Sequence, residues 1–197
     1  MSFPLLLASS SPYRAEILTK LRVPFIQASP DIDETPQVGE TPSDYVLRLS
    51  IEKANVLRAE HPEYWIIGSD QTCVVDGKPV GKAGQSDKAV AQLKQVQGRK
   101  ITFLTGLCLL SPEGDEYTLV EPFEVHFHDL PENALERYVE IEQPLDCAGS
   151  FKVEGLGITL FSALNGRDIN SLVGLPLIGL CELLREVGLE PLTLAEA

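Results

Sequence analysis

Basic residues are scarce in this chain of 197 residues, in which 16 Lys and Arg stand against 29 Asp and Glu and give a formal net charge of -13. Binding to long nucleic acid requires a basic surface that releases counterions from the phosphates. The acidic balance therefore argues against long nucleic acid as a partner. A small anionic substrate remains compatible with it, because one metal ion and a few converging Lys and Arg side chains can reverse the local field in a binding site.

Cysteine and long apolar runs are also in short supply. The 4 cysteines have no Cys-x-x-Cys spacing, so neither a zinc site nor a disulfide framework is predicted. The apolar start from Phe3 to Ala8 lacks a preceding basic segment and is too short for a signal peptide. No stretch is long and apolar enough to span a bilayer. We therefore expect a cytoplasmic protein with no membrane partner.

Strand-like and helix-like segments alternate along the chain. The apolar share of 44% is ordinary for a globular protein, so we expect one folded unit with little disorder. Apolar runs bounded by turn residues predict strands, and apolar residues at helical spacing predict helices. Their alternation predicts an α/β fold around a mixed sheet. The expected strands are 4–8, 23–28, 64–67, 73–75, 78–80, 100–110, 117–127 and 158–161, and the expected helices are 12–21, 41–59, 86–97, 131–141 and 171–187.

Four polar loops are expected at the ends of predicted strands, and they contain residues that a core would not need. Ligands of open α/β sheets bind at strand ends, so these loops are candidates for one site. They are Ser9 to Arg14, Asp33-Glu34, Gly68 to Gln71, and Gly81-Lys82.

The first of these loops runs from Ser9 through Ser10, Ser11, Pro12 and Tyr13 to Arg14, at the start of a predicted helix. Backbone N–H groups at a helix start, serine hydroxyls and an arginine together suit phosphate oxygens. A plain serine cap with a surface arginine is the commoner explanation of such a string. The string by itself leaves both interpretations open.

Carboxylates form the second group of candidates. Asp70 closes an apolar run, where a carboxylate can bind a metal or take a proton from water, but an Asx-type turn explains it equally well. Asp33 and Glu34 either form a solvated acidic loop or help Asp70 to hold a hard divalent cation. From spacing alone, Lys53 and Lys82 read as surface lysines.

Six motifs follow one another along nearly the whole chain. They are Leu7-Ala8-Ser9-Ser10-Ser11-Pro12-Tyr13-Arg14, Asp33-Glu34-Thr35, Glu52-Lys53-Ala54, Gly68-Ser69-Asp70, Gly81-Lys82 and Gly174-Leu175-Pro176. Their joint occurrence and order resemble the Maf nucleotide pyrophosphatases. The resemblance implies a single Maf- and ITPase-like domain over residues 1–197, with a mixed twisted sheet, flanking helices and two lobes around a cleft. It also implies metal-dependent hydrolysis of nucleoside triphosphates to a monophosphate and pyrophosphate.

The resemblance implies catalytic roles for Asp70, Glu34, Lys53 and Lys82. Asp70 would deprotonate or orient the water that attacks the α phosphorus, and Glu34 would help to place the metal. We expect Glu34 and Asp70 as metal ligands and Mg²⁺ or Mn²⁺ as the cofactor. Preorganised cations would neutralise the charge of the phosphates. The residues expected to hold the triphosphate are Ser9, Arg14, Lys53 and Lys82.

Two segments within this pattern resemble the 7-methyl-GTP pyrophosphatase subgroup of the family. They are Gly68-Ser69-Asp70-Gln71 and Cys147-Ala148-Gly149-Ser150-Phe151-Lys152-Val153-Glu154-Gly155. The dTTP/UTP subgroup typically has arginine, threonine and glutamine at the positions of Tyr13, Gln71 and Glu154. The chain also departs from the 7-methyl-GTP subgroup, because Tyr13 stands where tryptophan is usual and Ala83 follows Lys82 where proline is common.

Tyr13, Gln71 and Glu154 are therefore the expected specificity residues. A carboxylate at Glu154 can accept two hydrogen bonds from the guanine edge, whereas glutamine suits uracil or thymine. The Tyr13 ring can stack on a base and would gain from the positive charge of a methylated purine. Without the motif context, a solvated loop carboxylate and a partly buried helix tyrosine are the simpler readings.

We expect a small-molecule nucleotide as the partner, and the sequence leaves the oligomeric state open, including a homodimer. One rival interpretation is a pyrophosphatase for dTTP, UTP or another noncanonical nucleotide. Another is a nucleotide-binding regulator of cell division without turnover, since the family takes its name from an effect on septum formation. The presence of Asp70, Glu34, Lys53 and Lys82 argues against an enzyme that has lost its activity.

Overall fold

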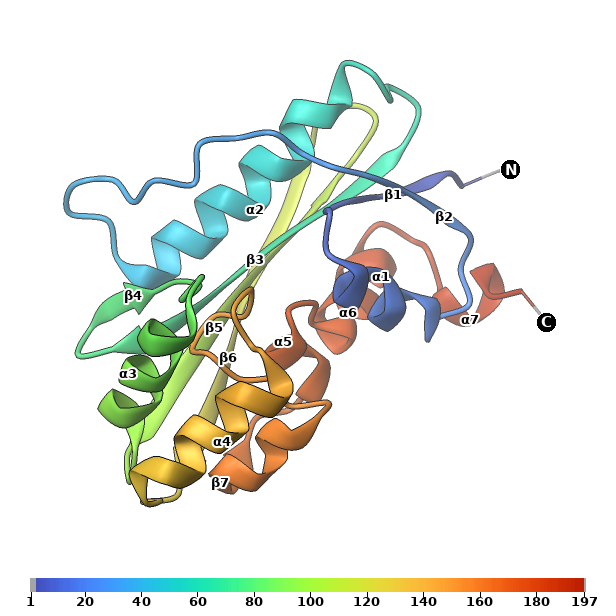
Figure 1. Ribbon diagram of the computed structural model, residues 1–197. Coiled ribbons are helices and arrows are strands. Elements are labelled where there is room, and N and C mark those ends of the chain that lie inside the picture. The colour runs from blue at the N-terminus through green and yellow to red at the C-terminus, as the bar shows by residue number, and fades with distance from the viewer. Residues whose placement is uncertain (1–2, 197) are drawn as a thin grey trace. The chain divides into compact units, whose positions relative to one another are not determined.

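The computed structural model describes residues 3–196. Within this range the chain divides into two compact units, and Figure 1 traces it through its helices and strands. Strands β3 (Trp65–Val75), β5 (Lys100–Leu110) and β6 (Glu116–Phe127) contribute residues to both units. The first unit comprises Met1–Asp70, Thr105–Glu121 and Asp168–Ala197, and the second comprises Gln71–Leu104 and Pro122–Arg167.

Parallel strands form the centre of the first unit. Strand β1 (Leu5–Ala8) pairs in parallel with β2 (Phe25–Ala28) on one side and with β3 on the other. All of β1 is buried, as expected for a continuous apolar run in the middle of a parallel sheet. The chain continues from β1 to one neighbour and later returns to the other side, so the strand order reverses at β1. Ligands of open α/β sheets favour this kind of position.

Helices cover both faces of this sheet. Within residues 3–196 of the first unit they are α1 (Pro12–Thr19), α2 (Pro42–Arg58), α5 (Ile169–Val173), α6 (Leu177–Glu186) and α7 (Pro191–Leu194). Leu5 and Leu7 of β1 belong to the apolar cluster of α1 and α6, whereas Leu6 and Ala8 belong to that of α2. Alternate strand residues point to opposite faces, which explains the separate clusters. Figure 1 shows α2 on one side of the strands and α1 with α6 on the other.

The two helices that begin next to the expected site have the predicted starts. Ser11 caps α1 by accepting a hydrogen bond from the backbone N–H of Arg14 at 3.4 Å. Thr41 caps α2 in the same way, with the N–H of Asp44 at 3.2 Å. Each cap is followed by a proline, whose fixed φ suits the first helical position and whose missing N–H costs nothing there. Local sequence therefore determines where both helices begin.

Two glycines allow α2 to approach the sheet closely. A Cβ atom added at Gly68 of β3 would lie 1.9 Å from the Ser50 carbonyl oxygen, and one at Gly106 of β5 would lie 2.2 Å from that of Val46. Both oxygens belong to the backbone of α2, which cannot move aside as a flexible side chain would. Helix α2 is thus fixed against β3 at the level of Gly68, next to Asp70.

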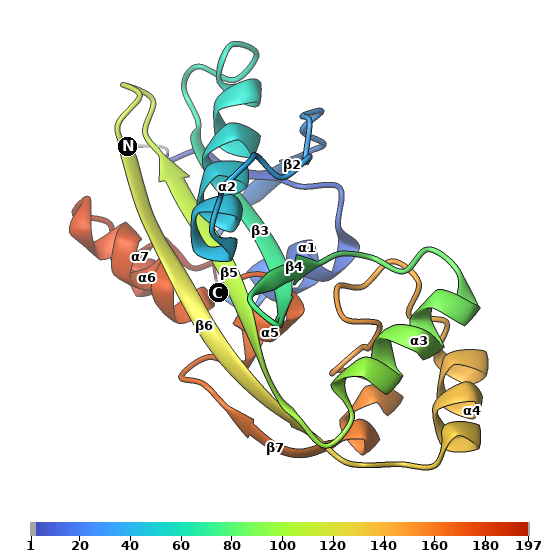
Figure 2. The same ribbon diagram turned by 90° about the vertical axis from the view of Figure 1, so that its left-hand side faces the viewer.

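The second unit combines a hairpin, a helix pair and an aromatic core. Strand β3 turns into β4 (Lys78–Val80) at Asp76 and Gly77, whose φ values of 52° and 74° suit a tight hairpin turn. Helices α3 (Ser86–Val96) and α4 (Glu132–Glu142) lie side by side in both views (Figures 1 and 2). The short helix η1 (Leu156–Leu160) leads into β7 (Phe161–Asn165), which pairs antiparallel with β6. The aromatic core consists of Phe103, Phe127, Phe151 and Phe161.

Several expected boundaries are wrong. The strand predicted to end at Ile67 continues to Val75, so Gly68 to Gln71 lie inside β3 and not in a loop. Residues 156–160 form a 3-10 helix where a strand was expected to begin at Ile158. The predicted helix 171–187 is two helices, because Gly174 has a φ of 121° and Pro176 follows it.

The predicted fold class is confirmed: parallel and antiparallel strand pairs occur in a mixed sheet with flanking helices. The expectation of one domain with two lobes around a cleft stays a prediction. Within residues 3–196, none of the helices combines the length and the apolar character needed to cross a membrane.

Candidate functional site

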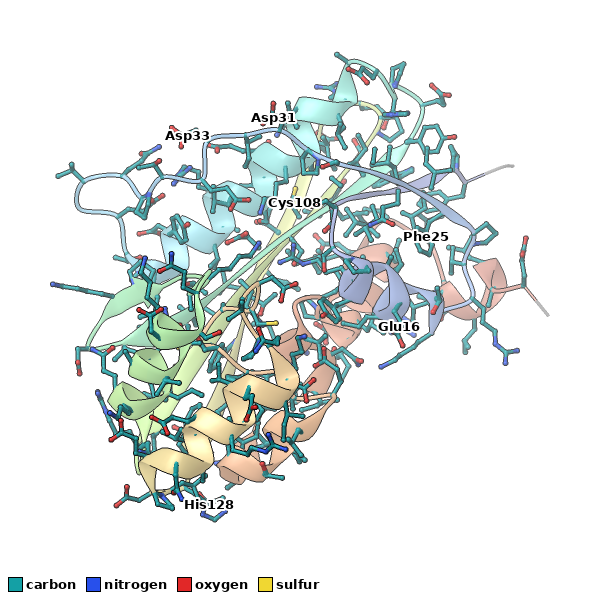
Figure 3. All side chains as sticks on the ribbon, in the orientation of Figure 1. Glu16, Phe25, Asp31, Asp33, Cys108 and His128 are labelled. Atoms are coloured by element: carbon teal, nitrogen blue, oxygen red, sulfur yellow. The ribbon has the colours of Figure 1, made fainter. Side chains whose placement is uncertain are left out.

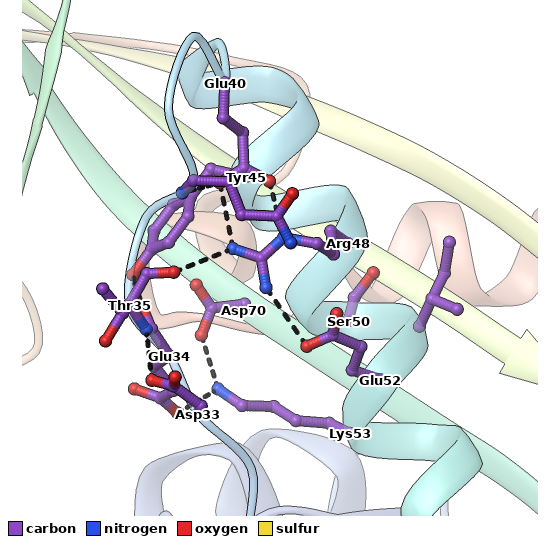
Figure 4. A network of polar contacts seen from close by, with 12 residues as sticks. Asp33, Glu34, Thr35, Glu40, Tyr45, Arg48, Ser50, Glu52, Lys53 and Asp70 are labelled. Carbon is purple, nitrogen blue, oxygen red and sulfur yellow. Dashed lines mark hydrogen bonds and ion pairs between the residues drawn. The ribbon is translucent and has the colours of Figure 1, made fainter.

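Lys53 is the centre of the polar cluster in the first unit. Its Nζ lies 2.5 Å from Oδ1 of Asp70 and 2.7 Å from Oε1 of Glu34, and its side chain is only 7% exposed. Figure 4 shows the three side chains meeting from helix α2, strand β3 and the loop before α2. An isolated buried ammonium is very unfavourable, so its two carboxylate partners are part of what makes this burial tolerable. The lysine that spacing alone assigned to the surface is therefore buried and paired.

The parallel strands explain why these residues meet. At the carboxyl end of β1, Ala8 pairs with Ala28 of β2 on one side and with Gly68 of β3 on the other. The residues that follow these pairs therefore lie at the same edge of the parallel region. They are Ser9, the loop of residues 29–41 and Asp70. The expected position at strand ends is thus confirmed for the residues that follow β1 and β2, while their role as a binding site stays a prediction. For β3 the expected position needs correction, since Asp70 projects from a strand that continues, where its backbone stays in the sheet.

Arg14 reaches the cluster from the first turn of α1. Its Nε donates to the Gly174 carbonyl oxygen at 2.7 Å, and its Nη1 donates to Ser9 Oγ at 3.5 Å. Burial lowers the pKa of Arg14, while the charges of Asp70 and Glu34 act in the opposite direction. Those two carboxylates therefore belong to the electrostatic surroundings of the guanidinium.

Ser9 and Ser11 have different structural roles in the segment that precedes α1. Ser11 provides the helix cap, so the plain structural interpretation holds for that residue. Ser9 is buried, and its Oγ accepts from the Ser11 N–H at 3.1 Å and from Arg14. Tyr13 is partly exposed on the first turn of α1. The structure brings Ser9 and Arg14 into direct contact, as a joint role in anion binding requires.

Gly174 also belongs to this cluster, and its role could not be predicted from the sequence. Its carbonyl oxygen accepts a hydrogen bond from Arg14 Nε. The single proton of the Ser69 hydroxyl is shared between this oxygen, at 3.0 Å, and the Gly106 carbonyl oxygen, at 2.8 Å. A Cβ at Gly174 would lie 3.2 Å from Arg14 Nε, and its φ of 121° strains any other residue. The break between α5 and α6 therefore orients Arg14.

The loop of residues 29–41 carries the predicted acidic pair Asp33 and Glu34. Figure 3 shows Asp31 and Asp33 along this loop. Asp33 Oδ1 accepts from the Thr35 N–H at 2.9 Å, and these hydrogen bonds with Thr35 lower the pKa of Asp33. Asp33 therefore forms the local Asx-type contact, while Glu34 points to Lys53 (Figure 4). Sequence reasoning could not separate these two neighbours.

The remaining predicted residues belong to the second unit. Gln71 directly follows Asp70 in β3 and is partly exposed, whereas the Lys82 and Glu154 side chains are exposed. The backbone of Lys82 pairs with Ala148 through an isolated antiparallel bridge. This bridge brings the Gly81-Lys82 motif next to the segment that leads to Glu154, two parts of the chain that are far apart in sequence.

Glu154 stands on a loop whose flanks are anchored. The N–H of Lys152 donates to the Tyr138 hydroxyl at 3.0 Å, and the N–H of Leu156 donates to Glu142 Oε2 at 2.9 Å. Ser150 donates to Gln92 Oε1 at 2.5 Å. Helices α3 and α4 thus hold the loop on both sides of the exposed Glu154 carboxylate.

Glu34 and Asp70 are the carboxylates that could hold a cation. Among residues 3–196 no group of three or more His, Cys, Asp or Glu side chains is arranged as a metal site. Mg²⁺ does not need such a cage, since one or two carboxylates suffice when substrate phosphates and waters complete the shell. Both carboxylates contact the same Nζ atom, so the hard oxygen donors already converge and fit a divalent cation that arrives with a phosphorylated ligand.

These features define an α/β protein with a charged site at the carboxyl ends of parallel strands, beside the point where the strand order reverses. Within that broad class the assignment is specific, because the family model described as Maf-like protein matches residues 4–187. The chain belongs to the Maf family.

Known relatives agree with this assignment. The chain is 52% identical over 187 residues to a protein of Pseudomonas aeruginosa named 7-methyl-GTP pyrophosphatase, with 94% of this chain and 97% of the relative covered. Among solved structures, a HAM1 protein from Coxiella burnetii matches 66% of this chain and 75% of its own, with a TM-score of 0.50 and 17% identity. At that identity the second likeness concerns the fold alone.

Proposed function

We propose that the chain is a nucleoside triphosphate pyrophosphatase that hydrolyses the bond between the α and β phosphates, with 7-methyl-GTP as the preferred substrate. The observation that carries this proposal is the 52% identity to the Pseudomonas aeruginosa protein of that name, over nearly the full length of both chains. The geometry of the first unit supports it independently, because a buried lysine pairs with two carboxylates at the strand ends, and the charges of both carboxylates act on a nearby arginine.

Asp70 is the proposed general base. Its carboxylate is buried and Lys53 holds it in place at 2.5 Å, so it has a fixed direction in which to orient a water and accept its proton. Fixed charges in a site with little water interact more strongly than charges in bulk solvent. The attack of that water on the α phosphorus breaks the bond to the β phosphate, and pyrophosphate leaves.

Cations of the chain stabilise the phosphates. Arg14 is held by Gly174 and Ser9, which leaves its charge available at the start of α1, where helix N–H groups also favour anions. Lys53 supplies a second charge from α2. A divalent cation held by Glu34 and Asp70 would add neutralisation of the phosphate charge during the reaction.

Selection of the base is assigned to Tyr13, Gln71 and Glu154. An exposed carboxylate such as Glu154 can accept two hydrogen bonds from guanine N1–H and its exocyclic amine. Tyr13 offers a partly exposed ring for stacking. Lys82 is assigned to the triphosphate. These four roles rest on the family motifs.

The test is pyrophosphate release by the purified full-length chain. 7-Methyl-GTP, GTP, dTTP and UTP are compared with Mg²⁺, with Mn²⁺ and with EDTA. We expect one pyrophosphate per nucleotide, the highest kcat/KM with 7-methyl-GTP, and no turnover in EDTA. Preferred cleavage of dTTP or UTP would overturn the substrate assignment. Nucleotide binding without any pyrophosphate release would overturn the enzymatic one and leave a nucleotide-binding regulator.

A further inference from the structure

The loop of residues 29–41 has little of its own to hold it in place. It contains neither helix nor strand, and most of its side chains are exposed, with Val38 fully so. Segments with few buried apolar contacts open at low free-energy cost. Glu34 nevertheless meets Lys53 at 2.7 Å. Something outside the loop must therefore fix the position of this carboxylate.

Arg48 of α2 donates hydrogen bonds to two residues of the loop, Glu40 and Thr35. Its Nε and Nη2 donate to the two carboxylate oxygens of Glu40 at 2.6 and 2.9 Å, and Nη2 also donates to the Thr35 carbonyl oxygen at 3.3 Å. The side chains of Arg48 and Glu40 are only 18% and 8% exposed. A two-point pair with this much burial is more strongly directional than an exposed ion pair. Glu52, also on α2, accepts a hydrogen bond from Arg48 Nη1 at 3.1 Å and keeps the guanidinium oriented.

Tyr45 holds the loop at Glu34 itself. Its hydroxyl donates to the Glu34 backbone carbonyl at 2.9 Å. Burial, and then the charges of Asp70 and Glu34, raise the pKa of Tyr45 to about 12, so the hydroxyl keeps its proton at neutral pH. The Arg48 guanidinium lies 5.7 Å from the centre of the Tyr45 ring. Tyr45 and Arg48 are three residues apart and share one face of α2.

These contacts assign a task to residues that the reaction itself does not use. We infer that Arg48 and Tyr45 are positioning residues that fasten the loop of residues 29–41 to α2 and thereby hold the Glu34 carboxylate at Lys53 and Asp70. Figure 4 shows the arrangement, in which the residues that fasten the loop and Lys53 project from the same helix. The consequence for catalysis rests on the proposed function, whereas the fastening of the loop does not.

The first test measures the loop without any substrate. Arg48→Gln and Tyr45→Phe are compared with wild type by limited digestion with a Glu-specific protease, which cuts after Glu34 and Glu40. Exposed and loosened loops are preferred sites of cleavage. We expect cleavage in the loop to become about tenfold faster or more in Arg48→Gln, and faster to a smaller extent in Tyr45→Phe. Unchanged cleavage in both variants would overturn the inference.

A matched control is available in the same unit. Arg185 forms a similar two-point pair with Glu190, at 2.8 and 3.1 Å, but contacts no part of the loop. Arg185→Gln should leave loop cleavage and turnover at the wild-type level. If it accelerates loop cleavage as much as Arg48→Gln does, the effect is general destabilisation and the inference fails. Should Arg48→Gln not fold, Tyr45→Phe removes a single hydroxyl and decides the same question.

The second test is a double-mutant cycle with Glu34→Gln. If Arg48 acts through Glu34, Arg48→Gln should lower kcat/KM by about 10- to 100-fold in the wild-type background, the scale of a displaced catalytic group. In the Glu34→Gln background it should change kcat/KM by less than about twofold. Equal losses in both backgrounds would overturn the role of Arg48. If the wild-type chain releases no pyrophosphate, the proposed function fails and loop cleavage alone decides the inference.

Discussion

Lys53 and Asp70 of the first unit differ from Lys82 and Glu154 of the second unit in how far their side chains are buried. In the first unit Lys53 and Asp70 are buried and paired, and they project from a helix and a strand. In the second unit Lys82 and Glu154 are exposed and lie on irregular segments. The framework around Glu154 is nevertheless packed, since a Cβ at Gly149 would lie 2.9 Å from the Phe103 ring.

This difference fits the demands of the two tasks. A general base and its cation must keep one geometry through the reaction, and burial between regular elements fixes that geometry at the cost of desolvation. A group that reads a base can remain hydrated until the ligand arrives and then exchange water for the base edge. On this view Lys53 and Asp70 of the first unit serve the reaction that every triphosphate shares, as does Lys82 of the second, whereas Glu154 of the second unit serves the choice among the triphosphates.

The largest expected effect tests the reaction side of this comparison. Asp70→Asn removes the proposed base while keeping the shape of the side chain. We expect turnover to fall by about 10²- to 10⁴-fold for every triphosphate, the usual scale for a general base. Pyrophosphate release and nucleotide binding are measured together with Tm, because Lys53 would lose the charge of Asp70 and keep that of Glu34. Turnover close to wild type in a folded variant would remove Asp70 from the mechanism.

A change in the framework of the first unit should have the next largest effect. In Gly68→Ala the new Cβ would lie 1.9 Å from the Ser50 carbonyl oxygen, so α2 must move away from β3. Overpacking against backbone costs about 3 kcal/mol or more, and Tm should fall by on the order of 10 °C. Turnover should fall too, because Lys53 moves with α2.

Gly81→Ala of the second unit is the matched control for this prediction. A Cβ at Gly81 has no atom within 4 Å, so its Tm should remain within about 2 °C of wild type. Calorimetry of both variants makes the comparison. Equal losses of Tm would contradict the view that the two units differ in how tightly their candidate residues are held.

Gly68 also marks the point where sequence reasoning reached its limit. The start of β3 was predictable from its apolar run, but Gly68, Ser69 and Asp70 are typical turn residues and suggested that the strand ends. Their partners are far away in sequence: the Ser69 hydroxyl lies within hydrogen-bonding distance of the carbonyls of Gly106 and Gly174, and Asp70 pairs with Lys53. Tertiary contacts of this kind override local preference, and no local pattern contains them.

Other features could also be predicted where they depend on neighbouring residues, and not where they depend on distant ones. The starts of α1 and α2 and the two short strand segments on either side of Asp76 and Gly77 depend on neighbouring residues, and their positions were predicted to within about one residue. The break at Gly174 was readable in principle, since a glycine followed by Pro176 ends helices, but the apolar periodicity on both sides concealed it. The motif resemblance predicted that Glu34, Lys53 and Asp70 act together, and the structure places their side chains in contact. It did not indicate that Arg48 and Tyr45 fasten the loop.

A smaller effect is expected where the second unit selects the base. Glu154→Gln replaces two acceptors with one donor and one acceptor, and a mismatched edge leaves polar groups unpaired. We expect kcat/KM for 7-methyl-GTP to fall by about tenfold relative to UTP and dTTP, or roughly 1.4 kcal/mol. Lys82→Ala is the companion variant, and it should slow all three nucleotides alike because its target is phosphate. A uniform loss in Glu154→Gln would remove the guanine-reading role.

The smallest effect concerns Tyr13, which lies in the first unit but is assigned to the base. Stacking on an aromatic ring contributes about 1 to 3 kcal/mol, and a methylated purine adds a cation–π component. Tyr13→Ala should therefore weaken 7-methyl-GTP more than UTP, whereas Tyr13→Trp should leave it unchanged or raise kcat/KM by a few-fold at most, since the larger ring stacks better. Steady-state kinetics on both nucleotides decide the matter. If Tyr13→Ala lowers both equally, the ring does not select the base, and this selection belongs to the second unit alone.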